Sequence, residues 1–195
     1  MNETNQTGRF APLFAELDRR LAGEAPVRLA IEGGSASGKT TLGKILAERY
    51  GCTVFHMDDF FLRSEQRPAA RFAEPGGNVD RERFLAEVLL PLRRGEKVFY
   101  RRFDCASMQL QNAVETAPKK LVVAEGAYSM HPDLAPYYDL SVFLDISPEL
   151  QRERISRRNT PEKAKRFFAE WIPMEQAYFA AFDIPAKCTL RLPIL

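Results

Sequence analysis

The chain is poor in the residues that build disulfide frameworks and metal clusters. Its 195 residues include two histidines and only three cysteines, Cys52, Cys105 and Cys188. The cysteines are widely separated, odd in number and not in a C-x-x-C pair, which argues against a disulfide framework or a zinc site. We therefore expect reduced, mostly structural thiols in a cytoplasmic protein.

Long apolar runs are also missing, and neither sign of charge dominates. The polar residues 1–8 lack the apolar core of a secretion signal, and no later segment reaches the length of a membrane span. With 28 Lys and Arg against 26 Asp and Glu, the formal net charge is +2, so the total charge gives no support for nucleic-acid binding. We expect a small-molecule substrate and neither a membrane nor a nucleic acid as a partner. The sequence does not decide whether the chain forms a homo-oligomer.

Strand and helix patterns alternate along almost the whole chain. A single domain over residues 1–195 is expected, because 45% hydrophobic residues suffice for one substantial core. The alternation predicts an α/β fold, with a mostly parallel sheet and helices on both faces. Expected strands are 27–31, 53–57, 97–100, 121–124 and 140–144, and expected helices are 10–21, 40–50, 80–92, 148–158 and 161–181. Residues 108–116 fit a hairpin arm, and prolines and glycines in 64–78 predict a long mobile loop.

The most informative motif is a complete phosphate-binding loop of the form G-x-x-x-x-G-K-[ST]. It lies between the first predicted strand and the next helix, as in P-loop NTPase-type folds with three α/β/α layers. Lys39 can reach the terminal phosphates of a nucleotide, and the Thr40 hydroxyl can coordinate Mg²⁺. The predicted nucleotide-binding residues are Gly33, Gly34, Ser35, Ala36, Ser37, Gly38, Lys39, Thr40 and Thr41.

Acidic residues follow two further strands. Glu125 ends the buried strand 121–124 and is a candidate Mg²⁺ ligand. The alternative is a purely structural role, in which it caps the next turn. Asp58 and Asp59 follow the strand 53–57, where a carboxylate could accept the proton of an attacking hydroxyl. Because successive strand residues point to opposite faces, only one of the two is expected to face the nucleotide, and the residues alone do not choose between them.

These motifs together resemble the uridine kinase and phosphoribulokinase family of P-loop kinases over about residues 25–160. The resemblance rests on the phosphate loop, then residues 56–61 (HMDDFF), 77–80 (GNVD) and 123–126 (VAEG). It implies transfer of a phosphate from ATP with Mg²⁺ to a hydroxyl of a small molecule, on an α/β sheet with a helical lid. The family's Asp-Ser-Phe-Tyr segment favours Asp58 as the base, and its Asn-Phe-Asp segment assigns Asp80 to the ribose hydroxyls of a nucleoside.

The departures from the family concern the acceptor. Uridine kinases continue with His-Pro where this chain has Arg81-Glu82, and the histidine expected after the base-recognising tyrosine, here Tyr100, is missing. Arg102 could recognise a different polar group. Uridine or cytidine is the leading acceptor, whereas pantothenate, glycerate, nicotinamide riboside and a sugar phosphate are alternatives.

An arginine-rich helix follows the last central strand, where the resemblance implies a lid at about residues 149–165. Arg154, Arg157 and Arg158 can share one helix face and close over the triphosphate, with Arg154 and Arg157 in catalytic roles beside Lys39 and Asp58. The alternative is that these arginines form a solvent-exposed basic face of the helix with no function in the site.

Two further alternatives follow from the same residues. A regulatory ATPase would keep the phosphate loop but need no acceptor pocket. A kinase of phosphorylated acceptors would need a second basic pocket, for which the candidates are Arg63, Arg67, Arg71, Arg101 and Arg102.

Overall fold

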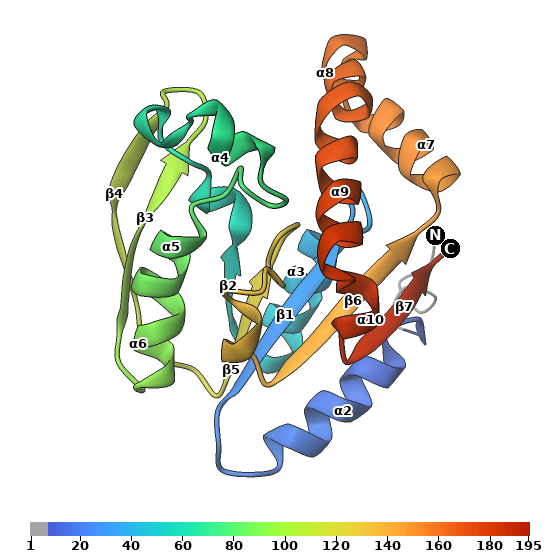
Figure 1. Cartoon of the computed structure of the whole chain (residues 1–195). Coiled ribbons are helices and arrows are strands. Elements are labelled where there is room, and N and C mark those ends of the chain that lie inside the picture. Colours follow the sequence, from blue (N-terminus) through green and yellow to red (C-terminus); the bar gives the residue numbers. More distant parts are fainter. Residues whose placement is uncertain (1–7) are drawn as a thin grey trace.

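The computed structural model describes residues 8–195. Its centre is a five-stranded sheet in the order β2-β5-β1-β6-β7, in which every neighbouring pair is parallel (Figure 1). All its carboxyl ends therefore meet at one edge, where ligands bind in such sheets. The strands are β1 (Val27–Gly33), β2 (Thr53–His56), β5 (Leu121–Glu125), β6 (Leu140–Ile146) and β7 (Leu190–Ile194).

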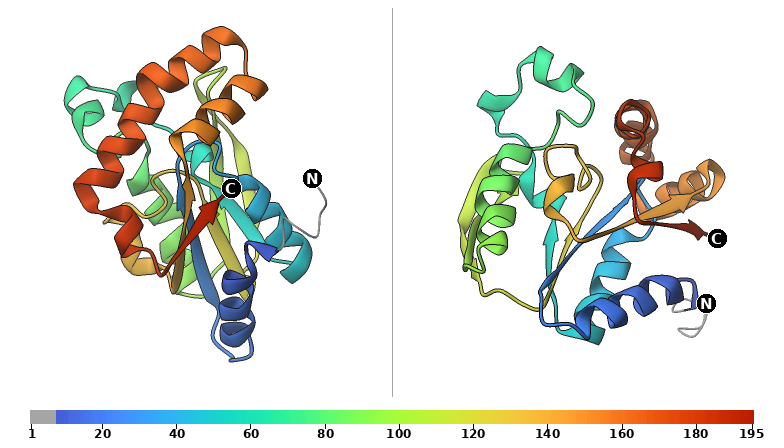
Figure 2. Two further views of the ribbon diagram at one scale, coloured as in Figure 1. Left: turned by 90° about the vertical axis from the view of Figure 1, so that its right-hand side faces the viewer. Right: turned by 60° about the horizontal axis from the view of Figure 1, so that its bottom comes forward.

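Helices cover both faces of this sheet (Figure 2). Because strand side chains alternate between faces, neighbouring residues such as Val122 and Val123 belong to two different hydrophobic cores. One core lies under α2 (Ala11–Leu21) and α3 (Lys39–Tyr50), and the other lies under α9 (Ile172–Phe182) and the helical segment 81–93. The predicted three-layer α/β/α fold is confirmed.

A separate antiparallel hairpin packs beside the second core. It pairs β3 (Val98–Asp104) with β4 (Gln109–Thr116) and lies outside the main sheet, on the left in Figure 1. The ring of Tyr100 stacks on that of Phe60 with a centroid distance of 5.6 Å, which joins the hairpin to the segment after β2. The hairpin arm expected at residues 108–116 is thereby confirmed.

Two of the predicted helices are interrupted by a π-helical turn, and a proline follows each turn at the same distance. Residues Leu85–Leu89 form a π turn before Pro91, and Phe167–Trp171 form one before Pro173. A proline lacks an N–H and its ring collides with the carbonyl four residues earlier, so a wider turn relieves the conflict without breaking the helix. Further helices are α4 (Ala69–Ala73), α5 (Arg81–Phe84), α6 (Leu90–Arg93), α7 (Pro148–Arg158), α8 (Pro161–Arg166) and α10 (Ile184–Lys187). No helix within residues 8–195 is long and apolar enough to cross a membrane.

Two sequence expectations need correction. Prolines and glycines do not keep residues 64–78 free of regular structure, because a 3₁₀ turn at Ser64–Gln66 and the short α4 form there. The strand β7 was not expected from the sequence. It contains Pro193, and it is an edge strand paired only with β6, so a missing N–H is tolerated there.

Candidate active site

The phosphate loop connects β1 to α3 at the carboxyl edge of the sheet. Lys39 Nζ donates hydrogen bonds to the carbonyl oxygens of Gly33 and Gly34, at 2.7 and 3.0 Å. The loop forms one wall of a cavity of about 470 Å³. Lining residues predicted from the sequence are Ser35, Ala36, Ser37, Gly38, Lys39, Thr40, Thr41, Asp58, Glu125, Arg154, Arg157 and Arg158.

The two candidate Mg²⁺ ligands lie side by side. Thr40 Oγ1 donates to Glu125 Oε1 at 3.0 Å, and His56 Nδ1 lies 2.6 Å from the same carboxylate oxygen. The hydrogen bond with Glu125 raises the pKa of His56 despite its partial burial. A hydroxyl and a carboxylate are the hard oxygen donors that Mg²⁺ takes from proteins, usually one or two beside phosphate and water. The pair therefore fits the ion, although no cluster of three His, Cys, Asp or Glu forms among the described residues.

Asp58 and Asp59 follow β2 in a 3₁₀ turn at Met57–Phe60 and point to different surroundings. Asp58 lines the cavity, where desolvation raises its pKa while the charge of Lys39 opposes that shift. Asp59 Oδ2 instead lies 3.4 Å from Arg102 Nε, on the hairpin. The geometry thus separates the two carboxylates, and only Asp58 lines the cavity with the loop.

Four arginines surround the outer part of the cavity. Arg154, Arg157 and Arg158 reach it from α7, and Arg9 reaches it from the segment before α2. Arg154 Nη1 donates to the Ala36 carbonyl at 3.2 Å, so it already contacts the phosphate loop. Burial and the neighbouring Arg9 and Arg157 lower the pKa of Arg154, because like charges disfavour ionisation.

Two residues that no sequence pattern singles out hold the loop from outside. Glu175, on α9, accepts hydrogen bonds from the Ser35 backbone N–H at 2.9 Å and from its hydroxyl at 2.5 Å. Gln151, on α7, donates to the Ser35 carbonyl at 2.9 Å. Desolvation raises the pKa of Glu175, while Lys39 and Ser35 act in the opposite direction. A lone glutamate or glutamine on a helix carries no local pattern, so only the tertiary structure reveals these contacts.

A second glutamate that no sequence pattern singles out lies beneath the loop. Glu32, at the end of β1, is fully buried and accepts hydrogen bonds from the backbone N–H groups of Gly33, Tyr128 and Met130 and from the Tyr178 hydroxyl. Burial raises its pKa to about 7 in spite of these donors. Its carboxylate joins β1, the segment after β5 and α9.

The residues predicted to bind the acceptor lie away from the lining of this cavity. Asp80 is 2% exposed, caps the N-terminus of α5 by accepting from Arg83 N–H, and also accepts from Gln66 Nε2 at 3.0 Å. Tyr100 is 3% exposed among Phe rings, and Arg102 lies against Asp59. A ligand would have to replace the Gln66 contact to reach Asp80, so the acceptor roles of these residues stay predictions.

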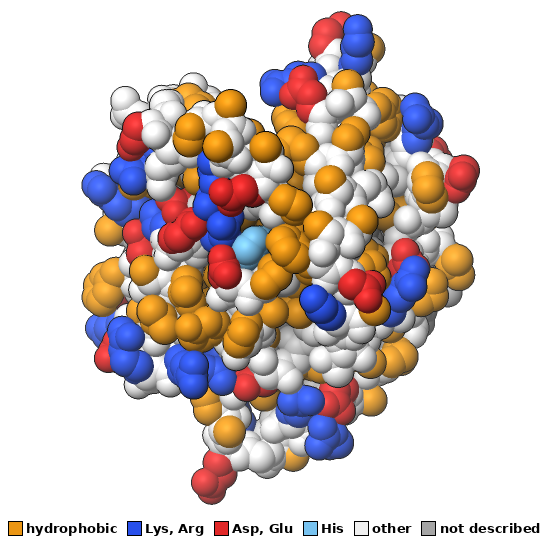
Figure 3. All heavy atoms as spheres, in the orientation of Figure 1, with side chains coloured by type: hydrophobic (Ala, Val, Ile, Leu, Met, Phe, Trp, Pro, Cys, Tyr) orange, Lys and Arg blue, Asp and Glu red, His pale blue; other side chains and the backbone are white. Residues whose placement is uncertain are grey.

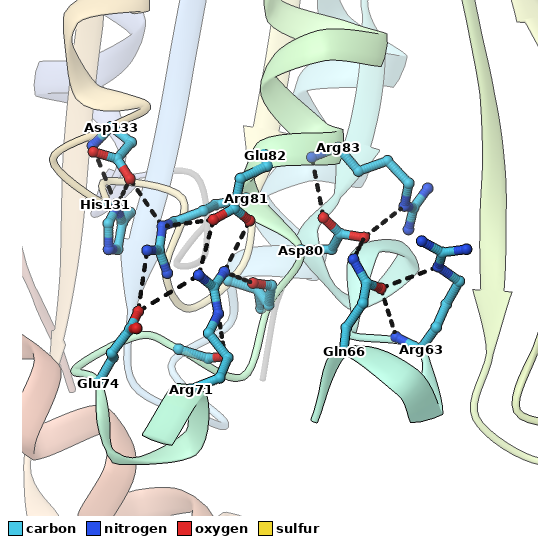
Figure 4. Close-up of polar contacts among 12 residues, drawn as sticks. Arg63, Gln66, Arg71, Glu74, Asp80, Arg81, Glu82, Arg83, His131 and Asp133 are labelled. Carbon is cyan, nitrogen blue, oxygen red and sulfur yellow. Dashed lines mark hydrogen bonds and ion pairs between the residues drawn. The ribbon is translucent and has the colours of Figure 1, made fainter. Parts of the chain in front are cut away.

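A network of ion pairs and hydrogen bonds holds residues 71–82, the segment that leads into α5 (Figure 4). Arg71 donates to the carbonyls of Gly77 and Val79 and to both carboxylate oxygens of Glu82. Arg81 donates to Asp133 and to Glu74. In Figure 3, basic and acidic side chains accordingly lie next to one another over α4 and α5. These contacts connect the predicted loop to α5 and to Asp133.

Comparisons with known proteins point to nucleotide-dependent kinases. A family model described as shikimate kinase matches residues 35–92. A dephospho-CoA kinase of Bradyrhizobium diazoefficiens is 29% identical over 70% of this chain and 73% of its own length. A uridine kinase of Chloroflexus aurantiacus is 26% identical over 72% and 71%, respectively.

Solved structures agree on the fold. A protein described as a possible uridine kinase of Bacillus stearothermophilus superimposes with a TM-score of 0.66 at 19% identity, over 91% of this chain and 99% of that one. A candidate fructose transport system kinase of Silicibacter sp. has a TM-score of 0.75 at 24% identity, over 94% and 98%.

Proposed function

Because the chain is a uridine kinase-like P-loop kinase, we propose that it transfers the γ-phosphate of ATP, with Mg²⁺, to a hydroxyl of a small molecule. The leading acceptor is a nucleoside such as uridine or cytidine. The observation that carries this proposal is the shared cavity, in which the phosphate loop, Asp58, Glu125 and three arginines of α7 face one another. A regulatory ATPase would need no carboxylate placed to orient an acceptor hydroxyl, which is the role proposed for Asp58.

Each residue has a task in this proposal. Lys39 and the loop amides bind the phosphates, for which Lys39 leaves the carbonyls of Gly33 and Gly34 that it contacts in this structure. Thr40 and Glu125 would hold Mg²⁺, which supplies charge neutralisation at the phosphates when bound. Asp58 accepts the proton of the attacking hydroxyl and orients its oxygen.

Cationic side chains complete the site. Arg154, Arg157 and Arg158 offset the negative charge that develops on the transferred phosphoryl group. With Lys39 and Arg9 they place five cations around a cavity that also holds three carboxylates, those of Asp58, Glu125 and Glu175. This excess of positive over negative side chains suits a polyphosphate ligand.

The arginines considered for a phosphorylated acceptor are largely engaged by the protein itself. Arg71 is tied to Glu82 and two carbonyls, Arg67 donates to the Leu62 carbonyl, and Arg102 lies against Asp59. Arg63 donates to Gln66 and pairs with Glu65. This favours an acceptor without a phosphate group.

The test is ADP release from ATP and Mg²⁺ across a panel of acceptors. The panel holds uridine, cytidine, other nucleosides, nicotinamide riboside, pantothenate, glycerate and sugar phosphates, with Lys39→Ala as the inactive variant and exposed Lys44→Ala as its matched control. We expect stimulation by a nucleoside that Lys39→Ala abolishes and Lys44→Ala retains. ATP binding without stimulation by any acceptor would instead favour the regulatory ATPase.

A further inference from the structure

The Ser35 residue of the phosphate loop is held at every polar atom by the C-terminal helices. Its N–H and hydroxyl donate to Glu175 of α9, and its carbonyl accepts from Gln151 of α7. Both side chains are about 5% exposed or less. The loop is therefore shaped from outside as well as by its own glycines.

We propose that Glu175 and Gln151 are positioning residues that hold the first turn of the phosphate loop in the form that binds the nucleotide. The inference rests on the proposed binding of ATP at this loop. It adds that α7 and α9 influence the affinity for ATP through these two residues. Neither residue is expected to react. Each acts through Ser35.

Burial of a carboxylate at this place argues for such a task. An ionised side chain costs free energy when it leaves water, and a well-packed apolar residue would serve packing alone at least as well. Glu175 nevertheless lies in the cavity wall with both oxygens on Ser35. The two hydrogen bonds from Ser35 offset the free-energy cost of burying the Glu175 carboxylate. They act on a residue of the phosphate loop, whose backbone geometry determines how the nucleotide binds.

The space around Gly34 supports the same conclusion. A Cβ atom added at Gly34 would lie 2.8 Å from Gln151 Nε2 and 3.6 Å from Glu175 Oε2. The absence of a side chain at Gly34 therefore leaves room for Gln151, and the Glu175 carboxylate lies at ordinary contact distance beside it. The loop and the two helices are packed as one unit.

Both helices also contact parts of the site beyond Ser35. One turn after Gln151, Arg154 of α7 donates to the Ala36 carbonyl. One turn after Glu175, Tyr178 of α9 donates to Glu32 under the loop. A displacement of either helix would thus change the loop at several adjacent residues, which is how helix position can set nucleotide affinity.

The experiment measures ADP binding by calorimetry, together with the KM values for ATP and for the acceptor and the melting temperature. Glu175→Ala should weaken ADP binding and raise the KM for ATP about tenfold, with the KM for the acceptor unchanged. Glu175→Gln should restore both to within about threefold, because an amide can accept from the Ser35 N–H and donate to its hydroxyl. Glu170→Ala, on the same helical segment but exposed and paired with exposed Arg166, is the matched control and should leave all values unchanged.

A second variant keeps the test decisive if Glu175→Ala folds poorly. Gln151→Leu removes only the contact to the Ser35 carbonyl and should raise the KM for ATP selectively as well. A lowered melting temperature with unchanged ADP affinity and KM for ATP in the Glu175 and Gln151 variants would overturn the inference. Absence of ADP binding by the wild-type protein would overturn the proposed function itself.

Discussion

Thr40 and Glu125 are 85 residues apart in the chain, yet the Thr40 hydroxyl donates to the Glu125 carboxylate at 3.0 Å. The contact joins the beginning of α3 to the end of β5. It exists because β5 lies beside β1 in the parallel sheet, which brings both carboxyl ends to the same edge. The pair is the structural basis of the proposed Mg²⁺ site.

Replacing Glu125 should therefore change the response to Mg²⁺ before anything else. We expect Glu125→Gln to raise the Mg²⁺ concentration for half-maximal turnover about tenfold or more, because a neutral amide attracts the cation less than a carboxylate does. Titration of ADP release with Mg²⁺ measures this. Exposed Glu115→Gln, on the hairpin, should behave as wild type. An unchanged Mg²⁺ dependence in Glu125→Gln would remove this residue from the site.

The two aspartates after β2 should differ strongly. Asp58→Asn should lower turnover by about 10²–10⁴-fold while ADP still binds, since the variant loses a proton acceptor and keeps the phosphate loop. Asp59→Asn should have a smaller effect, because Asp59 lies against Arg102 outside the cavity lining. Parallel turnover and ADP-binding measurements on the two variants decide the question. A larger loss in Asp59→Asn would make Asp59 the base.

The stability of the protein should depend on the protonation of Glu32. Burial raises the pKa of Glu32 from 4.5 to about 7, so between these values the folded protein holds a proton that the unfolded chain releases. The free energy of unfolding should therefore fall as pH rises from 4.5 to 7, by about 3 kcal/mol from this residue. Glu32→Gln should lack this decline.

Urea denaturation at several pH values compares Glu32→Gln with the wild type, with exposed Glu24→Gln as the control. His131 contributes the opposite slope, because burial and Arg81 lower its pKa to about 4 and its neutral form is lost from the folded state only below that. This contribution is common to all three proteins and cancels in the difference. Equal pH dependence in wild type and Glu32→Gln would contradict the prediction.

Gly126 should not tolerate a side chain. Its φ is +147°, and an added Cβ would lie 2.5 Å from Met57 Cβ. We expect Gly126→Ala to lose about 1–3 kcal/mol of stability and also turnover, because Glu125 and Asp58 are the adjacent residues along the two chain segments. Thermal unfolding and ADP release measure both effects. Gly23→Ala, in the exposed turn after α2, should change stability by less than about 0.5 kcal/mol.

Local patterns were sufficient for the phosphate loop and for most of the elements, although not for β7. The strand, loop and helix around Lys39 are contiguous, so their hydrophobic spacing and glycines already describe the local geometry. The parallel sheet followed from the alternation of strands and helices. The prediction of a loop without regular structure at residues 64–78 is wrong, because Arg71 holds this segment through Val79 and Glu82, contacts that no local pattern contains.

The chemistry of the contiguous motif and the position of single residues at strand ends can thus be predicted from the amino-acid order. Three features depend on the folded chain instead: which carboxylate lines the cavity, the capping of a helix by Asp80, and the contact of Glu175 with Ser35, 140 residues away. The difference comes from the range of the interactions. Propensity and periodicity act over a few residues, whereas hydrogen bonds and burial depend on neighbours in space that only the packing of the whole chain brings together.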